Sequence, residues 1–108
     1  MMEKDKLNQI NIIHELLKEL IDILERESDL TLKPSRNTIM DLIDYIEDSI
    51  NTNEQIDMVL IKKRFNGMFF PHAGLSEFYI QREDHEEMIR ENKKLSHIIE
   101  SLKDYLTP

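Results

Sequence analysis

KKRFNGMFFPHAGLSEF, residues 62–78, is the stretch around which the rest of the chain is organised. Both glycines of the protein and all four phenylalanines lie in it. Gly67 follows Asn66, a pair that predicts a helix end with glycine in the left-handed conformation after the cap. Pro71 disfavours helix at the residue before it. The backbone after Gly67 is therefore expected to be irregular, with helices on both sides.

Apolar side chains are unusually frequent in this irregular stretch, and two interpretations follow. In the first, the loop folds down and its rings close one end of a helix bundle, because large aromatic side chains dominate core energetics. In the second, part of the loop stays exposed as an anchor for a partner or as the wall of a pocket. The candidate partner-binding residues of the loop are Phe69, Phe70, His72 and Phe78.

Length and composition predict one domain, residues 1–108, with a core large enough to fold without disulfides or metal. The chain has no cysteine, so thiolate chemistry is excluded, and its formal net charge is −8. Such acidity argues against binding nucleic acid, which depends largely on neutralising phosphates. No apolar run approaches the roughly 20 residues of a membrane span, and the start lacks a secretion-signal pattern. We expect a cytoplasmic protein without a membrane partner.

Two helices are predicted in the first half of the chain. Residues 5–27 place apolar side chains at alternating three- and four-residue steps, which is the spacing of one helical face. This apolar stripe consists of Ile10, Ile13, Leu17, Leu20 and Leu24. It is widened by Leu16 and Ile23 and further by Ile12 and Ile21. Thr31 to Ser35 is expected to be a linker because it contains Pro34. A second helix should run from about Arg36 to Ile50, capped by Ser35.

Two more helices are predicted in the second half. Thr52 and Gln55 have the spacing of a capping box for a short third helix. Its residues 58–61 are apolar all round, which favours a central position. Asp84 and Glu87 repeat the cap spacing before a last helix, expected over about 84–106. On its apolar stripe, Asn92 lies either at the solvated edge or in a seam where it fixes register or oligomeric state.

Together these elements predict an all-α fold: an antiparallel four-helix bundle or a close relative, with an irregular aromatic loop between helices 3 and 4. The last helix would be roughly 34 Å long at 1.5 Å per residue. That is long for a small domain. Its C-terminal half is therefore expected to overhang or to pack against a second copy, and a homodimer is one of the two outcomes we consider.

Histidine and serine side chains are present, but they lack the sequence spacings typical of metal sites and of catalytic sites. None of His14, His72, His85 and His97 has a second histidine three or four residues away, which is the spacing that puts two metal ligands on one helical face. The sequence around Ser76 starts like a nucleophile elbow, but Phe78 replaces the closing glycine. We therefore expect no enzyme, no metal site and no cofactor.

Acidic residues line the predicted outer faces of the first two helices: Glu15, Glu19 and Asp22, then Asp41, Asp44 and Asp48. One interpretation is that these are ordinary solvated faces. The other is that the two helices are neighbours and present one negative surface to a basic partner. Such a surface would accelerate association at low salt.

The loop and its flanks also resemble a family. Phe65-Asn66-Gly67-Met68, preceded by a helix and followed by Leu75-Ser76-Glu77-Phe78 and an acid-capped helix, is similar to a family of small uncharacterised helical bacterial proteins with a Phe-Gly-Gly-Met-Gly loop. Leu16-Leu17 and Leu20–Glu25 look like that family's first helix. The chain departs from the pattern at Asn66, at Phe69 and in the extra residues through His72. Some proteins of that family are suspected immunity partners of toxins, and the resemblance implies such a role as one expectation for this protein.

The sequence thus predicts a non-enzymatic, acidic, helical protein–protein interaction module, an immunity or regulatory partner of a bacterial protein. Its binding residues would be those of the aromatic loop together with Asp41, Asp44 and Asp48. The alternative is a small-ligand-binding protein, or an enzyme of unrecognised type, with its pocket under the loop from Phe69 to His72. An enclosed cavity lined by these residues would favour the alternative.

Overall fold

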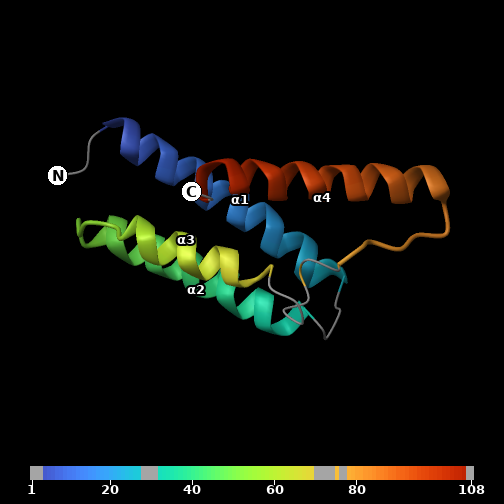
Figure 1. Ribbon diagram of the computed structural model, residues 1–108, viewed down its shortest axis with the longest axis horizontal. Coiled ribbons are helices and arrows are strands. Elements are labelled where there is room, and N and C mark those ends of the chain that lie inside the picture. The colour runs from blue at the N-terminus through green and yellow to red at the C-terminus, as the bar shows by residue number, and fades with distance from the viewer. Residues whose placement is uncertain (1–3, 28–31, 70–74, 76–77, 107–108) are drawn as a thin grey trace.

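A computed structural model describes residues 4–27, 32–69, 75 and 78–106 (Figure 1). Within these residues the protein contains four helices and no strand: α1 (Lys4–Glu27), α2 (Lys33–Asn51), α3 (Met58–Gly67) and α4 (His85–Leu106). The fold is therefore all-α, as the apolar periodicity predicts, and is consistent with a helical bundle.

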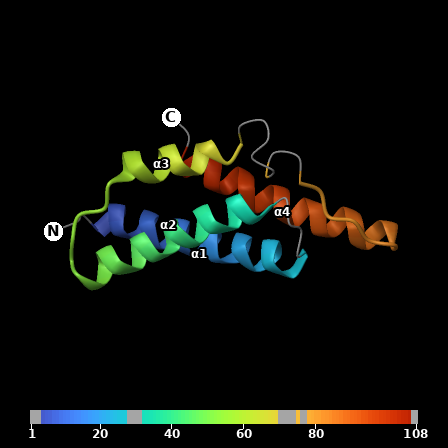
Figure 2. The same cartoon turned by 90° about the horizontal axis from the view of Figure 1, so that it is seen from below.

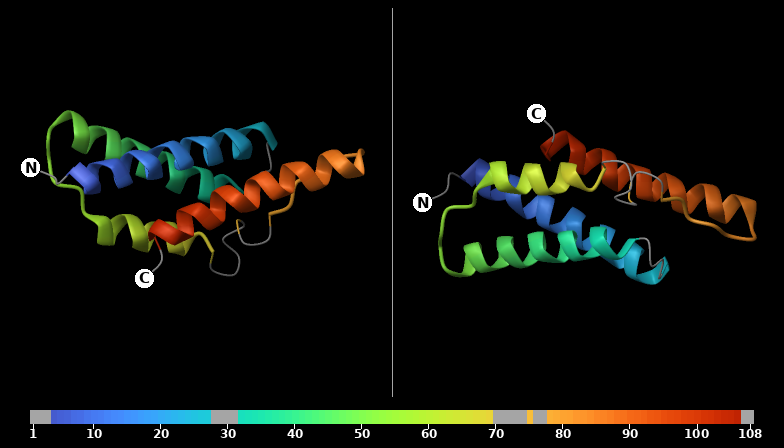
Figure 3. Two further views of the ribbon diagram at one scale, coloured as in Figure 1. Left: turned by 90° about the horizontal axis from the view of Figure 1, so that it is seen from above. Right: turned by 60° about the horizontal axis from the view of Figure 1, so that its bottom comes forward.

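The most extensive packing is that of α1 against α4 and against α2, and α3 packs less extensively against α2 and α4 (Figures 1 and 2). The molecule is elongated, with principal extents of 49 × 25 × 25 Å. The first residues of α4 project beyond the other helices (Figure 3). The buried residues of α4 begin at Leu95. The expectation that the C-terminal half of this helix overhangs is therefore wrong, because that half supplies its packed face.

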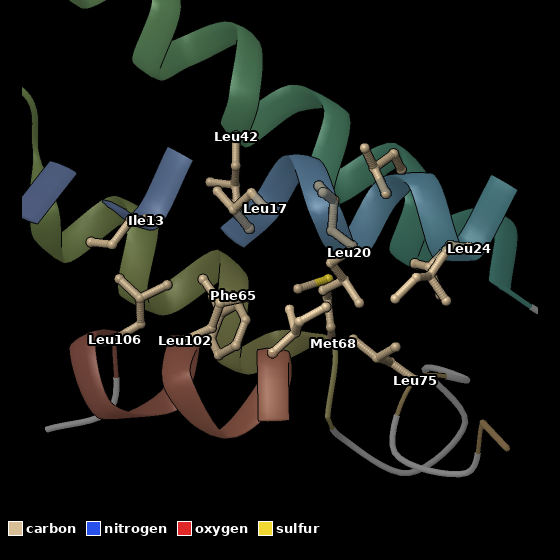
Figure 4. Close-up of a cluster of buried hydrophobic side chains, with 14 of the residues drawn as sticks. Ile13, Leu17, Leu20, Leu24, Leu42, Phe65, Met68, Leu75, Leu102 and Leu106 are labelled. Atoms are coloured by element: carbon tan, nitrogen blue, oxygen red, sulfur yellow. The ribbon is translucent and has the colours of Figure 1, made fainter. Parts of the chain in front are cut away.

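The core lies along the axis between the four helices, where side chains from α1, α2, α3, α4 and Leu75 point toward one another (Figure 4). The stripe predicted for α1 is buried throughout, and Ile21 and Ile23 are buried with it. Ile12, which was expected to extend the stripe, is 45% exposed. Among the described residues Phe65 is the largest fully buried side chain, and it lies where α3 meets α4.

The start of α2 differs from the prediction. Pro34 lies in the first turn of the helix and Leu32 is the N-cap residue, with no side-chain hydrogen bond to the helix. Proline is well accommodated there because the first amide hydrogens of a helix have no intrahelical partner. Ser35, expected to be the cap, is instead inside the helix and buried. The residues from Lys33 to Ser35 are thus helix rather than linker.

The start of α3 also differs. Asp57 is its N-cap, and its side chain accepts hydrogen bonds from the backbone amides of Val59 and Leu60. Thr52, the predicted cap, instead lies at the end of α2, where its hydroxyl donates to the carbonyl of Asp48 at 2.8 Å. The predicted central position for residues 58–61 is wrong as well. Val59 is 73% exposed, and only Ile61 of the four is fully buried.

The end of α3 lies at Gly67 as predicted, but Gly67 is its last helical residue and does not have the left-handed conformation. Asn66 does more than end the helix, because its side chain also connects α3 to α4. Its side-chain amide donates to the carbonyl of Lys62 at 2.8 Å and to the carbonyl of Leu106 at 3.1 Å. The C-terminal ends of α3 and α4 are therefore joined.

The start of α4 agrees with the prediction. Asp84 accepts hydrogen bonds from the amides of Glu86 and Glu87, and the acidic first turn suits the positive end of the helix dipole. Leu95, Ile98, Leu102 and Leu106 are buried along one face.

Candidate functional site

The phenylalanines that the structure describes, Phe65, Phe69 and Phe78, pack against the protein itself. Phe69 is half-buried against the core, with its ring centroid 5.1 Å from that of Phe65 at a tilt of 60°. The ammonium group of Lys103 lies 4.7 Å from the Phe69 centroid, which is a cation–π distance. Phe78 is also half-buried against the core. Phe70 and His72 lie outside the described residues.

The acidic candidates are all on the surface. Asp41, Asp44 and Asp48 are exposed on α2, as are Glu15, Glu19 and Asp22 on α1. We call these six residues the acidic surface. Its two helices pack side by side.

Within the described residues, one member of the acidic surface, Glu15, has an ion-pair partner, His14. His14 bridges the two helices, with Nε2 2.9 Å from a carboxylate oxygen of Glu47 and Nδ1 3.8 Å from Glu15. In the described part of the chain, no ion pair is made by the other five members of the surface, Glu19, Asp22, Asp41, Asp44 and Asp48.

A set of polar contacts that the sequence did not predict holds residues 80–84 against α1 and α4. Arg82 makes two hydrogen bonds of 2.7 Å to the two carboxylate oxygens of Glu27, the last residue of α1. Arg26 donates to Glu91 of α4 at 3.0 Å. The side-chain amide of Asn92 pairs with the backbone of Ile80.

The Glu27–Arg82 pair accounts for an acidic residue at the unfavourable end of a helix dipole. The hydrogen bonds from Arg82 lower the pKa of Glu27, since they favour the ionised carboxylate more than its partial burial opposes it. Glu27 has 10% of its side chain exposed, so its charge needs this partner. The pair therefore connects the end of α1 to the segment that precedes α4.

A groove runs between α2 and α3 on the surface of the protein. Its main part has a volume of about 530 Å³ and is lined by Pro34, Ser35, Thr38, Leu60, Lys63, Arg64, Gly67 and Met68. A second hollow of about 300 Å³ shares Leu60 and Arg64 with it and continues to Asp41, Leu42 and Tyr45. We call the two together the α2–α3 groove. Phe69 does not line either part. The predicted ligand pocket under the loop from Phe69 to His72 falls largely on residues outside the described set.

Residues 4–27, 32–69, 75 and 78–106 contain no group of three or more histidine, aspartate or glutamate side chains placed to hold a metal ion. Among their helices, none combines the length and the apolar character needed to cross a membrane.

Comparison of the chain with protein-family models, with curated proteins and with solved structures found no match.

Proposed function

We propose that this protein is a non-enzymatic interaction module that binds a basic protein partner through the acidic surface, as an immunity or regulatory protein of a bacterium would. The observation that carries the proposal is the exposure of six carboxylates on two helices that pack side by side. Five of them make no ion pair within the described residues. Their charge is therefore free to act on a partner.

The proposed mechanism is electrostatic steering followed by stoichiometric docking. A surface of one sign raises the local concentration of an oppositely charged partner and accelerates association, and added salt screens the effect. Rim charges act mainly on the association rate, whereas close packing decides how long the complex lasts. A steep salt dependence of the association rate is thus the signature of this function.

The proposal includes the finer arrangement predicted from the sequence, an antiparallel bundle with the aromatic loop between the third and fourth helices. The chain directions in Figure 1 support it, since α1 and α3 run one way and α2 and α4 run back. In that arrangement the acidic surface lies on a scaffold in which every helix has two neighbours. Such a scaffold holds the carboxylates in fixed positions.

The test uses a neutralised variant and a charge-matched control. The variant removes three charges from the acidic surface by Asp22→Asn, Asp44→Asn and Asp48→Asn. The control removes three exposed charges elsewhere by Glu54→Gln, Glu100→Gln and Asp104→Asn. Both are compared with the wild type in affinity capture from the native host, with the captured proteins quantified by mass spectrometry.

We expect a basic protein to be retained by the wild type and the control and lost by the surface variant. With the captured protein purified, its association rate should fall at least tenfold between 20 and 200 mM salt, on the order expected for steered association. An association rate indifferent to salt, or equal capture by all three proteins, would refute the proposal.

A further inference from the structure

The α2–α3 groove has the residue spacing of a helical binding surface. On α2 its lining residues Pro34, Thr38, Asp41 and Tyr45 recur at steps of three and four. On α3 the lining residues Leu60, Lys63, Arg64 and Gly67 do the same. Steps of three and four put side chains on one face of a helix. Each helix therefore presents one continuous edge to the groove.

The dimensions of the groove fit a peptide segment. From Pro34 to Tyr45 the α2 edge is roughly 16 Å long at 1.5 Å per residue. The main part of the groove is also largely open to solvent, whereas sites for small molecules usually enclose 70–90% of the ligand. A long groove between two helices is a shape in which a partner helix can bind through its apolar face.

The floor of the groove leaves space for apolar side chains. Leu60 and Met68 supply apolar lining, and small residues flank them at Ser35, Thr38 and Gly67. A Cβ built on Gly67 would have no heavy atom within 4 Å. The helix edge at Gly67 is thus bare, with room beside it for an anchor side chain of a ligand.

The charge of the groove selects the ligand. Lys63 and Arg64 are exposed at the groove and, with Lys62, form a run of three basic residues in a chain of net charge −8. Within the described residues neither Lys63 nor Arg64 makes an ion pair. An arginine guanidinium binds carboxylates in a bidentate manner, and such charge-assisted hydrogen bonds are the strong ones. The second hollow also has an acidic residue, Asp41, in its lining beside Arg64.

We infer that the α2–α3 groove binds an acidic amphipathic segment of a partner protein, with apolar anchors over Leu60, Met68 and Gly67 and a carboxylate held by Lys63 and Arg64. Asp41 lines only the second hollow, where it repels a further carboxylate, and this favours one direction of the segment. The groove shares Asp41 with the acidic surface and has the opposite charge preference.

The test selects ligands from a displayed library of random 16-residue peptides on the intact protein. Selected sequences should combine aspartate or glutamate with leucine, phenylalanine or methionine at steps of three and four. The consensus peptide, synthesised, is then titrated against variants by fluorescence anisotropy. Its binding site is located by amide chemical-shift changes, expected at Thr38, Leu60 and Gly67.

Two independent changes examine the groove. Gly67→Leu fills the space beside α3 and should weaken peptide binding at least tenfold, while Gly67→Ala, with one small Cβ, serves as its control. Lys63→Gln with Arg64→Gln should weaken binding by a similar factor, in line with the loss of charged hydrogen bonds. Lys93→Gln with Lys94→Gln removes the same charge from exposed positions on α4 and should leave binding unchanged. Circular dichroism checks that each variant is folded.

Several results would overturn the inference. One is the selection of basic or uncharged peptides, and another is no enrichment at all. A third is equal binding of the consensus peptide to the Lys63 and Arg64 variant and to the Lys93 and Lys94 variant. Saturable shifts at the groove with decanoate, in the absence of any peptide binding, would identify a site for small amphipathic anions instead. The Asp22, Asp44 and Asp48 variant should keep full peptide affinity, so failure of the acidic-surface proposal would leave this result unaffected.

Discussion

The side chain of Asn92 pairs with the backbone of Ile80 as a neighbouring strand would. Its oxygen accepts the Ile80 amide hydrogen at 2.8 Å, and its nitrogen donates to the Ile80 carbonyl at 2.8 Å. The second hydrogen of that nitrogen reaches the carbonyl of Met88 at 2.9 Å. One amide thus satisfies both backbone groups of a fully buried residue that belongs to no helix.

Replacing Asn92 should loosen residues 78–82 before it affects the helices. In Asn92→Leu the amide and carbonyl of Ile80 lose their partners, and each unsatisfied buried group costs about 1–3 kcal/mol. We expect a loss of about 2 kcal/mol in the free energy of unfolding in urea. Hydrogen exchange at the Ile80 amide should accelerate at least tenfold. Lys93→Ala, at the next position and exposed, is the control. Unchanged protection of Ile80 in Asn92→Leu would contradict the assignment.

The Glu27–Arg82 pair predicts a loss of stability in acid. Because the pKa of Glu27 is lowered in the folded protein from its ordinary 4.5 by the hydrogen bonds from Arg82, the folded state binds the proton less readily than the unfolded state. The stabilisation is therefore complete above the unfolded value and is lost as pH falls through the folded one. Urea midpoints measured from pH 7 to pH 3 should fall more for the wild type than for Glu27→Gln.

The control for that measurement is Glu100→Gln, which removes an exposed carboxylate from α4. Its pH profile should run parallel to that of the wild type. If Glu27→Gln also ran parallel to the wild type over the whole range, the pair would contribute nothing to pH-dependent stability. A larger fall for Glu27→Gln than for the wild type would have the wrong sign for a depressed carboxyl pKa.

Local patterns in the sequence predicted the helices and most of their buried faces, because burial of an apolar stripe decides where an amphipathic segment is helical. The same reasoning chose the wrong cap for α3. Thr52 and Asp57 both have side chains that cap well, and Asn53, with φ of 58°, turns the chain between them. Sequence spacing alone does not rank such competitors.

The polar contacts that hold residues 80–84 in place could not be predicted from local sequence patterns, because their partners are far apart in the sequence. Arg82 and Glu27 are 55 residues apart, and Arg26 and Glu91 are 65 apart. Such pairs follow from helix packing, which places the end of α1 beside α4. The α2–α3 groove has the same origin, since its two edges come from separate helices and only their packing creates the space between them.

The cap assignment for α3 gives a direct comparison of two substitutions. Asp57→Ala removes the acceptor for the amides of Val59 and Leu60 and should cost about 0.5–2 kcal/mol in unfolding free energy, as N-cap removal does elsewhere. Thr52→Ala removes one exposed hydrogen bond at the end of α2 and should cost less. Chemical denaturation of both variants measures the difference. A larger loss for Thr52→Ala would restore the capping box predicted from the sequence.

The effect of Gly67→Ala on stability has opposite signs in the conformation predicted from the sequence and in the conformation that the structure shows. If Gly67 had the predicted left-handed conformation, Gly67→Ala would destabilise the protein by roughly 1 kcal/mol, because a Cβ is strained there. In the structure Gly67 is helical and a Cβ meets no atom within 4 Å. Alanine should then stabilise the fold by up to about 1 kcal/mol through its higher helix propensity. Asn53→Ala, at a position with φ of 58°, should be destabilising and calibrates the cost of that conformation. A lower melting temperature for Gly67→Ala than for the wild type would show that the end of α3 has the other geometry.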